Sequence, residues 1–177
     1  MSKFEFDFDS VDDIFFVSEL VGSLECLYVN AQSIRNKVED LEDLLATVGH
    51  KDVLALTETW LQSDQGRYFN LPGFTAIHNT RVDTSLGRGV ALYINKKWSV
   101  QNLSFNAVDP RYNVLAVNIK CGNTTLNIIV GYNPSVNLVE GFLDVVESII
   151  GGIKGTRTLI FGDFNVDLFV KGDKQLM

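Results

Sequence analysis

The stretch at residues 159–168, Leu-Ile-Phe-Gly-Asp-Phe-Asn-Val-Asp-Leu, holds the residue types best suited to chemistry. Three apolar residues run into a glycine, and Asp163 and Asn165 follow it. This pattern predicts a buried strand that ends in a sharp bend and presents a carboxylate beside a carboxamide. A buried strand has no structural need for such an ending, whereas a site that handles a metal ion or a phosphate does.

Three other predicted strands also end in a polar residue, namely Asn30, Glu58 and Tyr132. Each ending alone is typical of a capped strand end, but the set offers complementary chemistry. Glu58 and Asp163 could supply oxygen ligands to a hard divalent cation. The amides of Asn30 and Asn165 can orient water or phosphate oxygens, and the Tyr132 hydroxyl can donate to a phosphate oxygen. If these strand ends share one rim, the set suits metal-assisted hydrolysis of a phosphate ester.

Two predicted helices accompany these strands. Apolar residues at helical spacing predict a first helix with its N-cap at Ser33 and its end at Gly49. A second helix carries apolar residues between 138 and 149 and is closed by Gly151 and Gly152. Because several strands follow one another in the middle of the chain, the pattern favours a mixed α+β fold over a doubly wound sheet. The predicted strands are residues 24–30, 53–58, 74–77, 89–94, 98–103, 114–120, 126–132 and 159–161.

The first 23 residues differ from the rest of the chain. Phe4, Phe6 and Phe8 alternate with acidic residues, and the segment holds one lysine against six acidic side chains. This composition is typical of a poorly ordered leader that can bind a protein partner, although an edge strand remains the alternative. We therefore expect the folded domain to occupy residues 24–177, a length that can bury one core.

Composition restricts the partners and the compartment. The net charge of −7 gives no support for tight non-specific binding to nucleic acid, but a DNA substrate stays compatible with it when metal ions neutralise the phosphates. Cys26 and Cys121 fit no metal-binding spacing and are expected as thiols in a reducing compartment. No apolar run approaches ~18 residues, and the start of the chain lacks the layout of a secretory signal. An intracellular location without membrane insertion is the expectation.

Five short motifs occur in a fixed order along the chain. They are Val-Asn-Ala-Gln-Ser-Ile at 29–34, Leu-Thr-Glu-Thr-Trp-Leu at 56–61, Gly-Arg-Gly-Val-Ala-Leu-Tyr at 87–93, Gly-Tyr-Asn-Pro-Ser at 131–135 and Phe-Gly-Asp-Phe-Asn at 161–165. In order and spacing the set resembles the endonuclease/exonuclease/phosphatase superfamily, in particular the apurinic-type endonuclease domain of non-LTR (LINE-like) retrotransposons. The resemblance covers residues 24 to 168.

The resemblance implies a four-layered αββα sandwich of the DNase I type and the hydrolysis of a DNA phosphodiester. It implies that Glu58 is the principal ligand of Mg²⁺ (or Mn²⁺), with Asn30 beside it. Asp163 would orient or deprotonate the attacking water, Asn165 would help to hold that water and the phosphate, and Tyr132 would contact the phosphate. In a retroelement the product would be the nick that exposes a primer for reverse transcription, which implies action in the nucleus.

The chain departs from the pattern of the family at three places. Gln32 stands where many relatives carry an aspartate, and Asn133 replaces the arginine of a common Tyr-Arg-Pro pattern. A later Ser-Asp-His motif is absent, because the two histidines, His50 and His78, both precede Asp163. We therefore expect a C-terminally truncated domain that lacks its last strands. Its nuclease activity should be weak, and its exposed sheet edges should favour self-association.

Several further residues have weaker assignments. Arg81, Arg88 and His78 could contact a nucleic-acid backbone, although solvated loop positions serve the two arginines equally well. Trp60 and Trp98 are expected in or near the core, and Asp167 at the surface or in a turn. Two other functions remain open: a non-catalytic relic or domesticated interaction protein on the same fold, and a phosphodiesterase that acts on a phospholipid or inositol phosphate.

Overall fold

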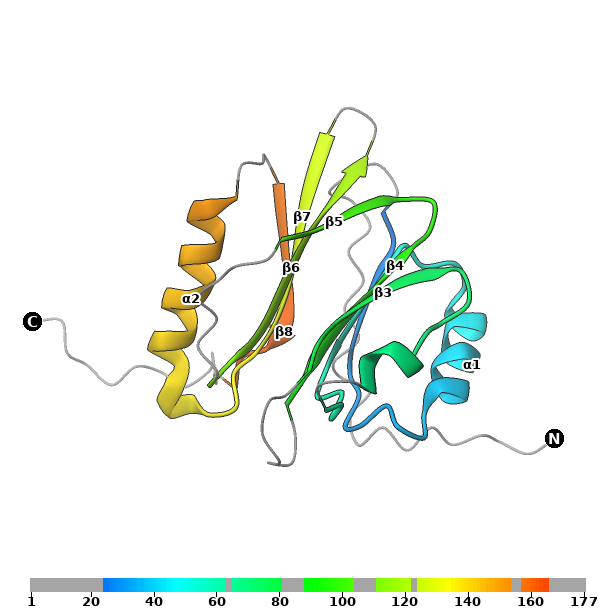
Figure 1. The fold of residues 1–177 in the computed structure, drawn as a ribbon, viewed down its shortest axis with the longest axis horizontal. Coiled ribbons are helices and arrows are strands. Elements are labelled where there is room, and N and C mark those ends of the chain that lie inside the picture. Colours follow the sequence, from blue (N-terminus) through cyan, green and yellow to red (C-terminus); the bar gives the residue numbers. More distant parts are fainter. Residues whose placement is uncertain are drawn as a thin grey trace, which may run out of the picture.

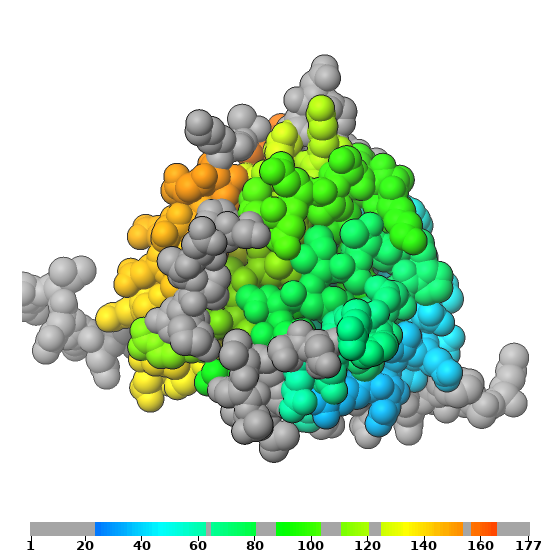
Figure 2. Space-filling model, viewed as in Figure 1, coloured from blue at the N-terminus to red at the C-terminus, as the bar shows by residue number. Residues whose placement is uncertain are grey.

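Four layers make up the domain in the computed structural model, which describes residues 24–62, 65–80, 88–103, 111–121, 124–153 and 157–165. Two four-stranded sheets pack face to face, and one helix covers the outer side of each (Figure 1). This order of layers confirms the predicted αββα sandwich. In the space-filling view the residues of α2 form the left flank of the molecule and those of α1 the right flank (Figure 2). The predicted leader, Arg81 and Asp167 lie outside the described residues.

The first sheet has the strand order β1-β2-β4-β3. β1 and β2 are parallel because α1 (Val38–Val48) crosses between them, and β4 pairs antiparallel with both β2 and β3. The connection through a helix is what allows two consecutive strands to end on the same side. The strands are β1 (Cys26–Asn30), β2 (Val53–Thr57), β3 (Phe74–Asn79) and β4 (Val90–Asn95). Short 3-10 turns lie at η2 (Gln65–Tyr68) and at η3 (Val136–Leu138).

The second sheet has the order β5-β6-β7-β8 and repeats this plan. β6 and β7 form the predicted antiparallel hairpin, whereas β8 is parallel to β7 because α2 (Val139–Gly152) joins the two. Each sheet therefore contains one parallel pair whose strands end at the same edge. The strands are β5 (Ser99–Leu103), β6 (Asn113–Cys121), β7 (Thr124–Tyr132) and β8 (Arg157–Asp163).

Alternation along the strands divides the apolar side chains among three clusters. The largest lies between the sheets and includes Tyr28 and Val130. A second lies beneath α1 and includes Leu54, and a third lies beneath α2 and includes Ile129 and Phe142. All five residues of β2 are buried, since the strand is covered on both faces. No helix in the described part of the chain is long and apolar enough to cross a bilayer.

The start of α1 differs from its prediction. Ser33 is not an N-cap: its φ is 84°, and its backbone N–H donates to the carbonyl of Glu58 at 2.8 Å. The helix begins at Val38 after Lys37, which makes no side-chain cap. Serine at this spacing looks like a cap, but the bond to the segment after β2 commits it to another role. The predicted end at Gly49 is confirmed, with a φ of 81°.

A buried carboxylate ties together the end of the first sheet that is remote from the strand-end residues. Asp52 is 1% exposed and accepts hydrogen bonds from the Glu25 amide at 3.1 Å and from Trp98 Nε1 at 3.1 Å. Lys97 and His50 also contact it. Burial by itself would raise the pKa of Asp52, but the hydrogen bonds, led by that from Lys97, lower it below its ordinary value of 3.8. Trp98 packs against the inter-sheet core, as expected.

Candidate active site

The ends of β1, β2, β7 and β8 bring the four predicted strand-end residues together. The amide nitrogen of Asn30 lies 3.4 Å from Glu58 Oε1 and 3.4 Å from Asp163 Oδ2. Glu58 follows β2 of the first sheet and Asp163 ends β8 of the second, so the amide joins carboxylates from opposite sheets. Tyr132, at the end of β7, lies near both carboxylates, whose charges act on its hydroxyl. Two carboxylates, an amide and a phenol thus share one rim of the sandwich.

Tyr132 stays protonated at this rim. Burial, followed by the negative charges of Glu58 and Asp163, raises the pKa of Tyr132 to about 12. Arg88 opposes this shift, which means that its positive charge lies near the phenol. The hydroxyl is therefore a hydrogen-bond donor at neutral pH. Arg88 is half-buried, and its position beside this group is compatible with the predicted contact to a phosphate.

The turn after β8 aims Asp163 and Asn165. The backbone N–H of Asn165 donates to Asp163 Oδ1 at 3.0 Å, and the Asn165 side chain donates to the carbonyl of Asn133 at 2.6 Å. Asn133 is fully buried, and its side chain donates to the carbonyl of Phe164 at 2.8 Å. In the sequence Asn133 appeared only as a lost basic contact. In the fold it clamps the end of β7 to the turn that carries the site.

Unusual backbone conformations gather around this rim. In the described residues, the non-glycine residues with positive φ all lie in the loops that carry or flank the strand-end residues. Such conformations cost about 1–3 kcal/mol each and persist only where the surrounding contacts determine them, which happens most often at functional sites. The residues with positive φ are Gln32, Ser33, Glu58, Trp60, Arg88 and Asn165.

Trp60, which the sequence placed in or near the core, contacts a residue of the site. Its indole Nε1 donates to Glu58 Oε2 at 3.3 Å, and the side chain is half-buried. The available signal was its place two residues after Glu58, but spacing alone does not tell whether the indole turns back onto the carboxylate.

His78 does not join the rim. It lies within β3 on the face of the first sheet that packs toward α1, with its ring edge-on to Tyr93 at 5.5 Å between centroids. Burial lowers the pKa of His78. The contact with Tyr93 does not involve the strand-end residues, and the substrate-binding role of His78 stays a prediction. The other histidine, His50, contacts Asp52 at the opposite end of β2.

The donor set suits Mg²⁺ or Mn²⁺. The described residues contain no group of three or more His, Cys, Asp or Glu side chains that could hold a metal ion. Mg²⁺ does not require one, because it usually binds through one or two carboxylates and completes its shell with water and substrate phosphate. Glu58 and Asp163 provide two carboxylates, and the Asn30 amide nitrogen between them occupies a position where negative charge converges. Glu58 would be the metal ligand of this set, with Asn30 beside it.

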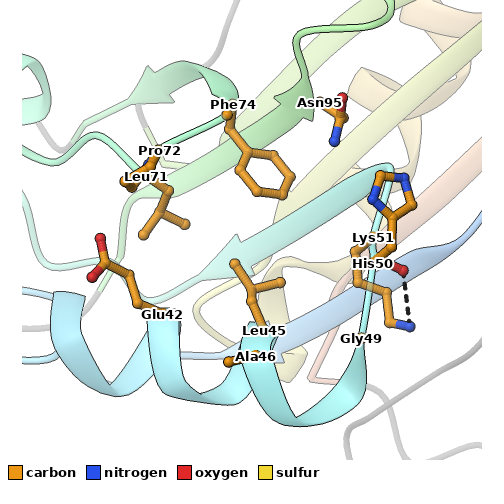
Figure 3. Close-up of a pocket in the computed structure, with 11 residues that line it drawn as sticks. Glu42, Leu45, Ala46, Gly49, His50, Lys51, Leu71, Pro72, Phe74 and Asn95 are labelled. Carbon is orange, nitrogen blue, oxygen red and sulfur yellow. Dashed lines mark hydrogen bonds between the residues drawn. The ribbon is translucent and has the colours of Figure 1, made fainter.

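A separate hollow lies between the end of α1 and the segment before β3 (Figure 3). Its volume is about 560 Å³, and Leu45, Lys51, Pro72 and Phe74 are among the side chains that line it. None of the strand-end residues contributes to it. This hollow therefore belongs to the remote end of the first sheet and not to the candidate active site.

An αββα sandwich with carboxylates and amides at one rim presents the residue types that metal-assisted hydrolysis of a phosphate ester needs. Residues 27–170 match the model of the Endonuclease/Exonuclease/phosphatase family, and the chain belongs to this family. Sequence comparison with curated proteins finds no significant match.

Solved structures share the fold at low identity. The endonuclease domain of TRAS1, a telomere-specific non-LTR retrotransposon, has a TM-score of 0.62 at 14% identity, covering 80% of this chain and 59% of that one. Humanised TDP2 from D. rerio has a TM-score of 0.59 at 17% identity, covering 81% and 63%. The catalytic domain of human Nocturnin has a TM-score of 0.56 at 17% identity, covering 87% and 68%. The chain thus spans about three fifths of the first two structures.

Proposed function

We propose that this chain is the metal-dependent endonuclease domain of a non-LTR retroelement and hydrolyses phosphodiesters in DNA. The observation that carries the proposal is the Asn30 amide held at 3.4 Å from both Glu58 and Asp163. Membership of the family supports phosphoester chemistry. Similar structures include the TRAS1 endonuclease and D. rerio TDP2 complexed with a single-strand DNA product, which supports DNA as the substrate. If genomic DNA is the target, the protein acts in the nucleus.

The residues of the rim have distinct parts in this reaction. A bound Mg²⁺ or Mn²⁺ would act as a Lewis acid on the phosphate, and Glu58 with Asn30 would hold it. Asp163 accepts the proton of the attacking water, while the backbone N–H of Asn165, at 3.0 Å from Asp163 Oδ1, stabilises the charge of the carboxylate. The Tyr132 hydroxyl donates to a phosphate oxygen, for which its raised pKa keeps the proton in place. Water adds to phosphorus, the bond to the leaving sugar oxygen breaks, and that oxygen takes a proton from solvent water.

Plasmid nicking tests this function. We expect the 177-residue chain to nick DNA slowly with Mg²⁺, by a factor of ~10²–10⁴ below a nuclease with a complete site, because neither His50 nor His78 lies where it could stabilise developing charge. Glu58→Gln should abolish the nicking, since it removes the proposed metal ligand. Glu147→Gln, on the exposed face of α2, serves as the matched control.

The metal role of Glu58 and the weakness of the activity can each fail without the other. Nicking that survives Glu58→Gln unchanged would remove the metal role of that residue. Rapid nicking that Glu58→Gln abolishes would keep the function and contradict the expected weakness.

A non-catalytic interaction protein on the same fold is the second candidate. The contacts of the two histidines, with Asp52 and with Tyr93, do not involve the strand-end residues, which favours this candidate. Calorimetry distinguishes the two functions, because an intact site with Glu58 should bind Mn²⁺ at millimolar concentration or below. A chain that folds but binds neither Mn²⁺ nor DNA supports the interaction protein.

We also propose that the 177-residue chain self-associates through β8. This strand has β7 on one side, and no described strand pairs with its other edge. Ile160 on β8 is 41% exposed, and Leu143 on α2 is 55% exposed. An open strand edge beside apolar side chains favours association.

Ile160→Lys should shift the chain toward monomer in sedimentation velocity, while Tyr68→Ser, exposed on η2, should not. A wild-type chain that stays monomeric at about 100 micromolar would disprove the proposal.

A further inference from the structure

We propose that Trp60 is a positioning residue for Glu58, an inference that rests on the proposed metal-dependent function. The indole Nε1 donates to Glu58 Oε2 at 3.3 Å, and the Asn30 amide donates to Glu58 Oε1 at 3.4 Å. Each oxygen of the carboxylate therefore has its own donor. Two donors from different segments fix the orientation of a side chain that would otherwise rotate freely at a half-exposed rim.

The backbone around Trp60 is held rigidly enough for this task. Its N–H donates to the carbonyl of Arg88 at 3.0 Å, and the N–H of Thr59 donates to the carbonyl of Gly89 at 3.1 Å. On the other side, the carbonyl of Thr59 accepts from Ile34 at 3.2 Å. Both Glu58 and Trp60 have positive φ, 51° and 58°. These contacts determine a conformation that the two residues would rarely adopt alone.

Gly89 is part of the same support. Its φ is 85°, and a Cβ at this position would meet Thr59 Oγ1 at 2.5 Å. Its N–H donates to Asn113 Oδ1 at 3.1 Å, so the loop before β4 is tied to β6 of the second sheet. The segment that carries Glu58 and Trp60 is thus anchored to both sheets.

An indole suits this position better than a basic side chain. It is a donor without charge, so it orients the carboxylate and leaves its negative charge available to a cation. A lysine or arginine in the same place would form an ion pair with Glu58 and compete with the metal ion. Partners that orient a metal ligand in this way typically contribute a factor of 10–100 in metal affinity.

The two tryptophans of the chain make the proposal measurable. Trp98 lies at the opposite end of the first sheet, where its indole donates to Asp52. A Trp98→Phe variant therefore keeps a single indole, beside Glu58. Mn²⁺ quenches indole fluorescence at short range, so binding at Glu58 should reduce the emission of this variant in a saturable way. The same titration with Glu58→Gln added should show no saturable quenching.

Calorimetric titration with Mn²⁺ tests the positioning role itself. Trp60→Phe keeps the ring and removes the N–H, and we expect its Mn²⁺ dissociation constant to rise ~10–100-fold above that of the wild type. Trp98→Phe should leave the constant unchanged. Circular dichroism checks that each variant is folded. If Trp60→Phe does not fold, the fluorescence titration in the Trp98→Phe background tests whether the ion binds at Glu58 beside Trp60, and an absence of saturable quenching would overturn the proposal.

The possible failures are distinct. Equal Mn²⁺ affinity of the wild type and Trp60→Phe would overturn the role of Trp60 and leave the proposed function intact. Saturable quenching that persists with Glu58→Gln would place the ion elsewhere and overturn it as well. A folded wild type that binds no Mn²⁺ would remove the proposed function and the inference together.

Discussion

Gly162→Ala is expected to lower the free energy of unfolding by about 3–5 kcal/mol, because an alanine there combines the cost of a strained backbone with the cost of overpacking. Gly162 has a φ of 156° and pairs with Gly131 across β7 and β8. A Cβ at this position would run into the backbone carbonyl of Gly131 and come within 2.9 Å of the ring of Phe164. Neither the strand ladder nor the ring can move without displacing the turn that aims Asp163.

Urea denaturation followed by circular dichroism measures the effect of Gly162→Ala. A loss of this size is a large part of the 5–15 kcal/mol that stabilises a typical domain. Gly151→Ala is the matched control, because no atom lies within 4 Å of a Cβ there and the residue is in the last turn of α2. Alanine at that helical position should stabilise the protein by up to ~1 kcal/mol. Equal stability of Gly162→Ala and the wild type would show that β7 and β8 do not approach as closely as described.

Asp52→Asn is expected to destabilise the protein by about 2–3 kcal/mol at pH 7, because it leaves a buried donor facing another donor. In the wild type, Asp52 Oδ2 accepts from the Glu25 amide and Oδ1 accepts from Trp98. An asparagine can present only one acceptor, so its NH₂ group must face one of these N–H groups. The partial exposure of Lys97, 47% at its side chain, limits what the ion pair adds.

The effect of Asp52→Asn should depend on pH with a defined sign. The pKa of Asp52 is lowered in the folded protein from its ordinary value of 3.8. A carboxyl group with a lowered folded pKa stabilises the protein above the unfolded pKa, and this contribution disappears as the pH falls through the folded pKa. The difference in unfolding free energy between wild type and Asp52→Asn should therefore be constant above about pH 5 and shrink below pH 4.

Exposed positions provide the comparison for Asp52. Asp43→Asn, on the exposed face of α1, should change the stability by less than about 0.5 kcal/mol at any of these pH values. A difference between wild type and Asp52→Asn that stays constant down to pH 3 would contradict the lowered pKa.

The strand-end residues could be predicted because their local pattern is strong. Apolar runs that stop at Asn30, Glu58, Tyr132 and Asp163 mark both the strands and the polar ends, and strand assignment rests on short-range periodicity. The helical start at Ser33 could not be assigned in this way. Its N–H bonds to Glu58, a residue that is distant in sequence, and such a contact leaves no local signal.

Roles that depend on the direction of a side chain were also beyond the sequence. Trp60 was expected in or near the core, but its hydrogen bond to Glu58 was not foreseen. Asn133 counted only as a missing arginine, yet it is fully buried and clamps the turn after β8. His78 was a weak candidate for the rim, and alternation along β3 turns its ring toward Tyr93 and α1. A shift of one residue in the strand would have turned the ring to the other face.

The sequence by itself determined the order of strands and helices, the polar residue at the end of each key strand and the motifs that resemble the family. These properties are local, because they follow from periodicity and from residue type. Only the tertiary structure decided that Asn30 lies between Glu58 and Asp163. The parallel pairing of β1 with β2 and of β7 with β8 aligns the strand ends within each sheet, and the packing of the two sheets brings both sets together. The convergence arises from contacts across 133 residues of chain, as between Asn30 and Asp163, and no short segment contains it.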